Sequence, residues 1–278
     1  MLGKMKLLYW KMEAVVVELY VSIKCVSNNR KTHSISAGLV VSLTSFPPRF
    51  NKLHLTLKGL LSQSITPDYV LLWIAEADFK YLTPKILQLE QQCEWFEIRK
   101  CEDIRSYKKL IPSLVEYPER YIVTADDDLF YPKDWLYKLT SKISDKKEII
   151  AHRVHTPLFT ENAVLPYAEW SHNSQGVGEV LFATGIGGIL YPPNSFSEQV
   201  FNEAVFMDIC SSADDIWFFW MARRNQTYVT WSECDLNLVN WRGTDESGLA
   251  VENVEHGKND LCIGKMRKKY GDVFTMSQ

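Results

Sequence analysis

Three consecutive aspartates, Asp126, Asp127 and Asp128, follow an apolar run in the segment YIVTADDDLFYP, residues 121–132. The run YIVT is typical of a buried strand, and three like charges at its end repel one another. Such a cluster indicates a cationic partner. Carboxylates are hard oxygen ligands that suit Mg²⁺ or Mn²⁺, and a divalent ion can bridge them to a diphosphate. Because residues two apart on an extended chain face the same side, we expect Asp126 and Asp128 to converge and Asp127 to turn to another partner. The alternative is a solvated acidic turn that caps the next helix.

A second carboxylate pair lies in the segment SSADDIWFFWMARRN, residues 211–225. Ser212 and Asp215 have the S-x-x-D spacing of a helix capping box, and that structural role alone accounts for Asp215. Asp214 adds a second carboxylate to the same turn, which is more than a cap requires. We therefore predict that Asp215, or failing that Asp214, is a general base that deprotonates an acceptor hydroxyl, with capping as the competing interpretation.

Other polar groups suit a phosphorylated ligand. In TSFPPR, residues 44–49, the hydroxyls of Thr44 and Ser45 and the guanidinium of Arg49 follow a predicted strand and can meet a base, ribose or phosphate. Lys108 and Lys109 are adjacent and can neutralise a leaving diphosphate. We expect all five to contact the donor. The alternatives are an ordinary surface arginine and lysines at a solvated helix start.

The segment ATGIGGILYPP, residues 183–193, has three glycines within four residues. Glycine allows the backbone to approach a ligand closely or to turn with positive φ, so Gly187 and Gly188 are predicted to form the floor of a cleft for acceptor and donor. The lysine and hydroxyl of a phosphate-binding P-loop are missing. Near the C-terminus, His256 is either a further metal ligand or a free surface imidazole.

These residues need a scaffold, and strand and helix patterns alternate from residue 38 onward. The strand patterns are GLVVSLTS (38–45), YVLLWIA (69–75), FEIRK (96–100) and YIVTA (121–125). The helical patterns are FNKLHLTLKGLLSQS (50–64), TPKILQLEQQ (83–92) and YKKLIPSLVEY (107–117). Such alternation predicts an α/β fold with a mostly parallel central sheet flanked by helices. Ligands bind outside the carboxyl ends of the strands in these sheets, and the aspartate triplet lies at such an end.

Composition narrows the function classes. The 278 residues carry a net charge of -3, which gives no general attraction to nucleic acid. The six cysteines form no CxxC pair, which argues against a zinc site and against a disulfide scaffold, so we predict reduced thiols in a cytoplasmic protein. Residues 37–278 are predicted to form one catalytic domain after an N-terminal extension, residues 1–36. Charges interrupt the apolar residues of that extension, so it is an accessory element packed on the domain or a weak peripheral contact with the inner membrane.

At the level of motifs, residues 38–270 resemble bacterial glycosyltransferases of the glycosyltransferase-A fold, similar to family 2. The matching segments, in order, are SLTSFPPRF, LLSQSITPDYVLLWI, YKKLIPSL, TADDDLFYP, AHRVH, TGIGGILYPP and ADDIWFFWMARRN. The resemblance implies a Rossmann-like catalytic domain of the hexosyltransferase type and a UDP- or GDP-sugar donor. It also implies a glycan or lipid-linked acceptor from capsule or lipopolysaccharide synthesis, and inverting transfer. The triplet then corresponds to the metal-binding DxD motif, with Asp128 as its last member and either Asp126 or Asp127 as its first.

Two other classes remain open. A nucleotidyltransferase acting on sugar phosphates also uses an α/β sheet, a divalent ion and clustered carboxylates, but its first loop is rich in glycine and lysine, whereas TSFPPR holds two prolines. A non-catalytic sugar-binding module would need neither the aspartate cluster nor the paired lysines. The aspartates therefore favour the glycosyltransferase.

Overall fold

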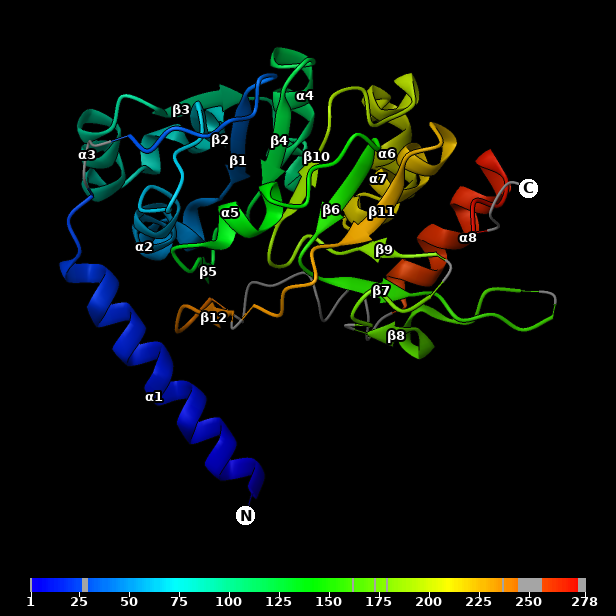
Figure 1. Cartoon of the computed structure of the whole chain (residues 1–278), viewed down its shortest axis with the longest axis horizontal. Coiled ribbons are helices and arrows are strands. Elements are labelled where there is room, and N and C mark those ends of the chain that lie inside the picture. Colours follow the sequence, from blue (N-terminus) through cyan, green and yellow to red (C-terminus); the bar gives the residue numbers. More distant parts are fainter. Residues whose placement is uncertain are drawn as a thin grey trace.

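A seven-stranded sheet forms the centre of the computed structural model (Figure 1). The structure describes residues 2–26, 30–161, 163–172, 174–178, 180–236, 238–244 and 257–274, with the backbone alone for residues 2–11. The strand order is β11-β6-β10-β4-β1-β2-β3. These strands are β1 (Leu39–Thr44), β2 (Tyr69–Ala75), β3 (Phe96–Cys101), β4 (Tyr121–Thr124), β6 (Glu148–Ala151), β10 (Ile189–Tyr191) and β11 (Tyr228–Trp231). Only β10 runs antiparallel to its neighbours, β4 and β6, in this sheet. The predicted α/β fold with a mostly parallel sheet is confirmed.

Helices cover both faces of this sheet because its central strands are apolar on both sides. In β1, Leu39, Val41 and Leu43 pack into one core, whereas Val40 packs into the other. Helices α2 (Phe50–Leu60), α3 (Pro84–Gln92) and α5 (Trp135–Thr140) contribute to the first core. Helices α4 (Ile111–Glu116), α6 (Glu203–Ile209), α7 (Asp214–Arg224) and α8 (Lys258–Tyr270) contribute to the second.

One predicted helix is divided. The pattern YKKLIPSLVEY predicts a helix over residues 107–117, but the structure has a 3₁₀ turn at Arg105–Lys109 followed by α4. Pro112 lies in the first turn of α4, where its missing N–H costs nothing, and it cannot continue a helix that began earlier. The division leaves Lys109 at the end of the 3₁₀ turn.

Two small sheets lie at the edge of the central sheet where the functional segments gather. One pairs β5 (Leu129–Phe130) with β12 (Val239–Asn240) in antiparallel orientation. The other joins β7 (Val154–Thr156) to β8 (Ser171–His172) and β9 (Phe182–Ala183). Strand β5 follows the aspartate triplet directly, so its pairing with β12 helps to fix the position of the triplet.

The N-terminal segment forms helix α1 (Leu2–Ile23), which lies against α2 and β12. Ala14 and Val21 are buried at this contact. Glu18 accepts hydrogen bonds from Lys52 and from Arg242, the latter at 3.2 Å, so ion pairs reinforce the apolar contact. Among the described residues, no helix combines the length and the apolarity needed to cross a bilayer.

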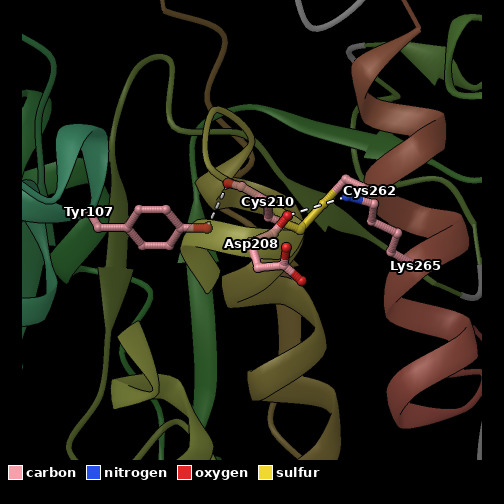
Figure 2. The surroundings of a disulfide bond; sticks show 5 residues. All are labelled: Tyr107, Asp208, Cys210, Cys262 and Lys265. Atoms are coloured by element: carbon pink, nitrogen blue, oxygen red, sulfur yellow. Dashed lines mark hydrogen bonds between the residues drawn. A yellow bond between two sulfur atoms is a disulfide. The ribbon is translucent and has the colours of Figure 1, made fainter. Parts of the chain in front are cut away.

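A disulfide joins Cys210, at the end of α6, to Cys262 in α8 (Figure 2). The prediction of reduced thiols is therefore wrong for these two residues. The pair is 52 residues apart in sequence, so no local spacing signals it. The hydroxyl of Tyr107 donates to the carbonyl oxygen of Cys210 at 2.8 Å and connects the disulfide to the 3₁₀ turn that precedes α4.

Candidate active site

The aspartate triplet follows β4 at its carboxyl end, between β1 and β10 in the sheet. The hydroxyl of Thr56 in α2 donates to the carbonyl oxygen of Asp127 at 2.9 Å. The backbone N–H of Trp241, next to β12, donates to the carbonyl oxygen of Asp128 at 3.0 Å. These bonds fix the backbone of the triplet from two sides, so its carboxylates belong to a rigid part of the fold.

Asp127 is the anchored member of the triplet, and Arg49 is its main cationic partner. The carboxylate of Asp127 accepts hydrogen bonds from the hydroxyl of Ser45 and from the guanidinium of Arg49, each at 2.5 Å. A second guanidinium nitrogen of Arg49 lies 3.1 Å from a carboxylate oxygen of Asp128. The partners of Asp127 are thus internal and Asp128 shares Arg49 with it, whereas Oδ2 of Asp126 is buried without a hydrogen-bond partner among the described residues.

A buried lysine connects the triplet to the second carboxylate pair. The Nζ atom of Lys109 lies 3.1 Å from a carboxylate oxygen of Asp214 and 3.9 Å from one of Asp126. The hydroxyl of Ser106 donates to the other oxygen of Asp214 at 2.9 Å. Two acidic segments that are almost 90 residues apart in sequence therefore share one cation.

The close packing of these charges raises the pKa of two carboxyl groups. Burial raises the pKa of Asp126 to about 7, against the opposing effect of Lys109 and with a further contribution from Asp128. Burial and the neighbouring Asp214 raise the pKa of Asp215 to about 6. Burial would lower the pKa of Lys109, but Asp214, Asp126 and Asp215 together hold it well above its usual value, so this lysine stays charged.

The carboxylate of Asp215 binds the backbone of another segment. Helix α7 begins after Ala213, which makes no side-chain cap hydrogen bond. One carboxylate oxygen of Asp215 accepts the backbone N–H of Gly185 at 2.9 Å, whereas Oδ1 is buried without a hydrogen-bond partner among the described residues. The N-cap position is taken by Ala213 and not by Ser212, the residue that the capping-box spacing places there.

Gly185 is a site residue that the sequence analysis missed. A Cβ atom at this position would lie 2.8 Å from Nζ of Lys109 and 3.2 Å from Oδ1 of Asp215. A side chain at this position would therefore displace the ammonium group of Lys109 and press on the carboxylate of Asp215. The available signal was its place in the same three-glycine segment as Gly187 and Gly188.

Only some of the residues that were predicted to contact the donor lie close to the aspartates. Arg49 and Lys109 lie beside the aspartates, whereas Lys108 points elsewhere and pairs with Asp103. The hydroxyl of Thr44 donates to the carbonyl oxygen of Trp73 at 2.7 Å, which serves the pairing of β1 with β2. Adjacent residues in a turn project in different directions, which explains why the two lysines do not act together.

The two predicted cleft glycines have different surroundings. Both have positive φ, 90° for Gly187 and 103° for Gly188. A Cβ atom on Gly188 would lie 2.6 Å from the indole ring of Trp135, so the absence of a side chain here permits close packing against that ring. Gly187 accepts the indole N–H of Trp135 through its carbonyl oxygen at 2.5 Å and lines a cavity.

That cavity has a volume of about 280 Å³ and borders the glycine segment at Ile186 and Gly187. Its lining is formed by His152, Arg153, Val154, Gln175, Ile186, Gly187, Trp231, Asp235, Leu236 and Leu238. The indole N–H of Trp231 donates to the carbonyl oxygen of His152 at 3.0 Å, which fixes the ring in the wall. The backbone N–H of Thr184 donates to the carbonyl oxygen of Arg153 at 3.2 Å, and the next residue, Gly185, binds Asp215, so the cavity wall is connected to this carboxylate. An apolar wall with a few polar groups suits a small polar ligand such as a sugar.

The acidic cluster fits a divalent cation that arrives with a phosphate ligand. Mg²⁺ is commonly bound through one or two carboxylates together with substrate phosphates. Oδ2 of Asp126 is buried without a hydrogen-bond partner among the described residues, which is the surrounding that a cation would satisfy. In the described part of the chain, no group of three or more His, Cys, Asp and Glu side chains is placed to hold a metal ion, so a cation here would need ligand atoms from the substrate as well. His256, the other predicted ligand, lies outside the described residues.

Among known proteins, this chain is similar only to remote relatives in structure. No protein-family model matches the chain, and no curated protein sequence matches it. Mannosyltransferase PcManGT from Pyrobaculum calidifontis, solved with GDP-Man and Mn²⁺, is 11% identical with a TM-score of 0.33 over 52% of this chain and 45% of its own. TarS from S. aureus, residues 1–349, is 10% identical with a TM-score of 0.44 over 84% of this chain and 72% of its own.

The inositol-1-phosphate CTP transferase from T. maritima is 9% identical with a TM-score of 0.43 over 85% of this chain and 98% of its own. At these identities and TM-scores, the three similarities carry no argument about activity. The chain spans less than half the length of the mannosyltransferase. The function of this chain therefore depends on the chemistry of its own candidate site.

Proposed function

We propose that this protein is a glycosyltransferase that moves a sugar from a UDP- or GDP-sugar donor to a hydroxyl group of a glycan or lipid-linked acceptor. The observation that carries the proposal is the junction made by Lys109, which lies between Asp126 and Asp214 at the carboxyl end of β4. Two acidic groups from distant segments, a shared buried cation and an adjacent cavity supply the parts that such a transfer needs. Following the resemblance in sequence, we assign the acceptor to surface polysaccharide synthesis.

On the donor side, Asp126 and Asp128 would hold Mn²⁺ or Mg²⁺. The ion would supply positive charge to the diphosphate as it leaves. Arg49 holds Asp127 and Asp128 in place, and Lys109 provides a permanent charge near the leaving group. The charge of Lys109 costs no reorganisation during the reaction, because its acidic neighbours already fix its position.

On the acceptor side, Asp215 is the general base. Its raised pKa of about 6 makes it a stronger base than an ordinary aspartate while it remains ionised at neutral pH. The acceptor hydroxyl gives its proton to Asp215, its oxygen forms a bond with the anomeric carbon, and the bond from that carbon to the phosphate oxygen breaks. Attack from the face opposite the leaving group inverts the anomeric configuration. The cavity beside Trp231 holds the acceptor sugar.

Calorimetry with UDP and GDP, in the presence and absence of Mn²⁺, tests the donor side. We expect tight binding only with metal, and we expect Lys109→Met to weaken it by roughly 1 to 3 kcal/mol, as for a charge-assisted hydrogen bond. Lys108→Met is the matched control, because the neighbouring lysine pairs with Asp103 and should leave nucleotide affinity unchanged. Equal effects of the two variants would contradict the assigned role of Lys109.

Product analysis separates the remaining classes. A glycosyltransferase releases nucleoside diphosphate from a nucleotide sugar, whereas a nucleotidyltransferase consumes a nucleoside triphosphate and releases pyrophosphate. A sugar-binding module would bind sugar without metal and release neither product. Release of pyrophosphate from a triphosphate and a sugar phosphate would replace the proposed function with the nucleotidyltransferase. A product that keeps the anomeric configuration of the donor would exclude the single displacement through Asp215.

A further inference from the structure

Helix α1 carries an exposed apolar stripe on the side that does not contact the domain. The stripe consists of Met12, Val16, Leu19, Tyr20 and Ile23, each between 54% and 81% exposed. Their spacing of three and four residues places them on one face of the helix. Five large apolar side chains together on a single helix face form a contiguous patch, which in soluble proteins marks an interaction surface.

The opposite side of α1 is already occupied by the domain. Val21 packs with Leu55 and Trp241, and Glu18 is held by Lys52 and Arg242. The helix is therefore apolar on two opposite sides, of which one holds it to the catalytic body. Figure 1 shows its N-terminal end extending beyond that body, so the stripe is accessible along its length.

Positive charge gathers where α1 ends. Lys31 and Lys133 lie at the same turn, because the backbone N–H groups of Thr66 and Ser64 donate to their carbonyl oxygens at 2.7 Å. After the larger effect of burial, both lysines also lower the pKa of Lys24 by repulsion. None of the three forms an ion pair with a carboxylate in the described part of the chain. Within the helix, the sequence adds Lys4, Lys6 and Lys11. An apolar stripe together with unneutralised lysines is the combination that binds an anionic bilayer surface.

We propose that the stripe of α1 and the cluster of Lys24, Lys31 and Lys133 form a docking surface for an anionic phospholipid membrane. The charge distribution favours lipid over a second copy of this chain. Two parallel copies paired through the stripe would bring two lysine clusters together, whereas anionic headgroups would neutralise one cluster. The surface also lies close to the candidate active site, because Arg242 binds Glu18 of α1 and the adjacent Trp241 binds Asp128. The inference does not depend on the proposed transfer reaction.

Cosedimentation of the full chain with vesicles tests this surface. We expect binding to vesicles of phosphatidylcholine mixed with phosphatidylglycerol, weaker binding at high salt, and little binding to phosphatidylcholine alone. Val16→Glu should weaken the partition at least about tenfold, through lost apolar burial and added negative charge. Replacing the three clustered lysines by glutamine should remove the preference for anionic vesicles, by about fivefold for each lysine.

A matched control is available on α4. Val115 is exposed to the same extent as Val16, 64%, but lies away from α1, so Val115→Glu should bind vesicles like the wild type. If Val16→Glu fails to fold, Leu19→Gln provides the same test with a smaller change. Absence of vesicle binding by the wild type, or equal binding by the two valine variants, would overturn the proposal. Sedimentation velocity without vesicles tests the alternative occupant. A dimer that is lost in Val16→Glu but kept in Val115→Glu would also overturn the proposal, because the stripe would then bind a second copy of the chain.

Discussion

Replacement of Asp215 by asparagine should make the protein more stable and less active at neutral pH. In the folded protein, the pKa of Asp215 is about 6, compared with about 3.9 for an unperturbed aspartate. In the unfolded chain the group ionises near pH 4, whereas in the fold it holds its proton until about pH 6. Above pH 6 the fold therefore contains a carboxylate whose ionisation it disfavours, and removal of that charge should stabilise the fold.

The size of the effect follows from the same difference. Two pKa units at 1.36 kcal/mol each give about 3 kcal/mol as an upper value. Asp215 is only partly buried, so solvent screening reduces this figure, and we expect a gain of about 1 to 2 kcal/mol. Asparagine keeps an oxygen that can accept the N–H of Gly185, so the contact between α7 and the glycine segment is preserved.

Two measurements check this prediction. Thermal unfolding at pH 7.5 should show a Tm several degrees higher for Asp215→Asn than for the wild type, and the difference should disappear below about pH 4, where both side chains are uncharged. Transfer activity at pH 7.5 should fall at least about a hundredfold, because no base accepts the proton. A helix cap predicts the opposite pair of results, a loss of about 1 kcal/mol and full turnover. A less stable Asp215→Asn variant that still transfers sugar would refute the assignment of Asp215 as a buried base.

Three further predictions concern metal, close packing and the disulfide. In calorimetry with Mn²⁺ present, Asp128→Asn should bind nucleoside diphosphate more than about a hundredfold more weakly than the wild type. Unchanged affinity would exclude Asp128 as a metal ligand. Gly185→Ala should lower turnover because its Cβ would displace the neighbouring charges, whereas Gly264→Ala in α8, with open space around its Cβ, should stabilise by about 1 kcal/mol and leave turnover unchanged. Cys262→Ser opens a disulfide loop of 52 residues and should lower the free energy of unfolding by about 4 kcal/mol, as measured by urea titration. Cys25→Ser, at an exposed free cysteine, should be as stable as the wild type.

The scaffold was predictable because its signals are local. Apolar runs that alternate with amphipathic segments specify the buried parallel strands β1 to β4 and the helices α2 and α3. The position of the triplet at the carboxyl end of β4 follows from the same pattern. The division of the predicted helix at residues 107–117 also has a local signal, Pro112, because proline within a helical pattern marks a helix start or a break.

The partners of the charged residues were harder to predict, because they depend on which segments the fold brings together. Lys108 and Lys109 are neighbours in sequence and equivalent in chemistry, yet one pairs with Asp103 and the other with Asp214. Nothing in the segment YKKL distinguishes them, since the choice is made by the turn geometry. The disulfide between Cys210 and Cys262 was hidden for the same reason.

The placement of Lys109 also explains why the acidic residues tolerate one another. Asp126, Asp214 and Asp215 all raise the pKa of Lys109, and each carboxylate gains from its charge. One cation cannot neutralise this group together with Asp128, so the site retains a net negative charge even with Lys109 and Arg49 in place. A divalent ion would remove that excess where Oδ2 of Asp126 has no partner among the described residues. Arg49 thus relieves part of the charge repulsion in the triplet by holding Asp127 inside the fold, and we expect a cation bound at Asp126 to relieve the remainder.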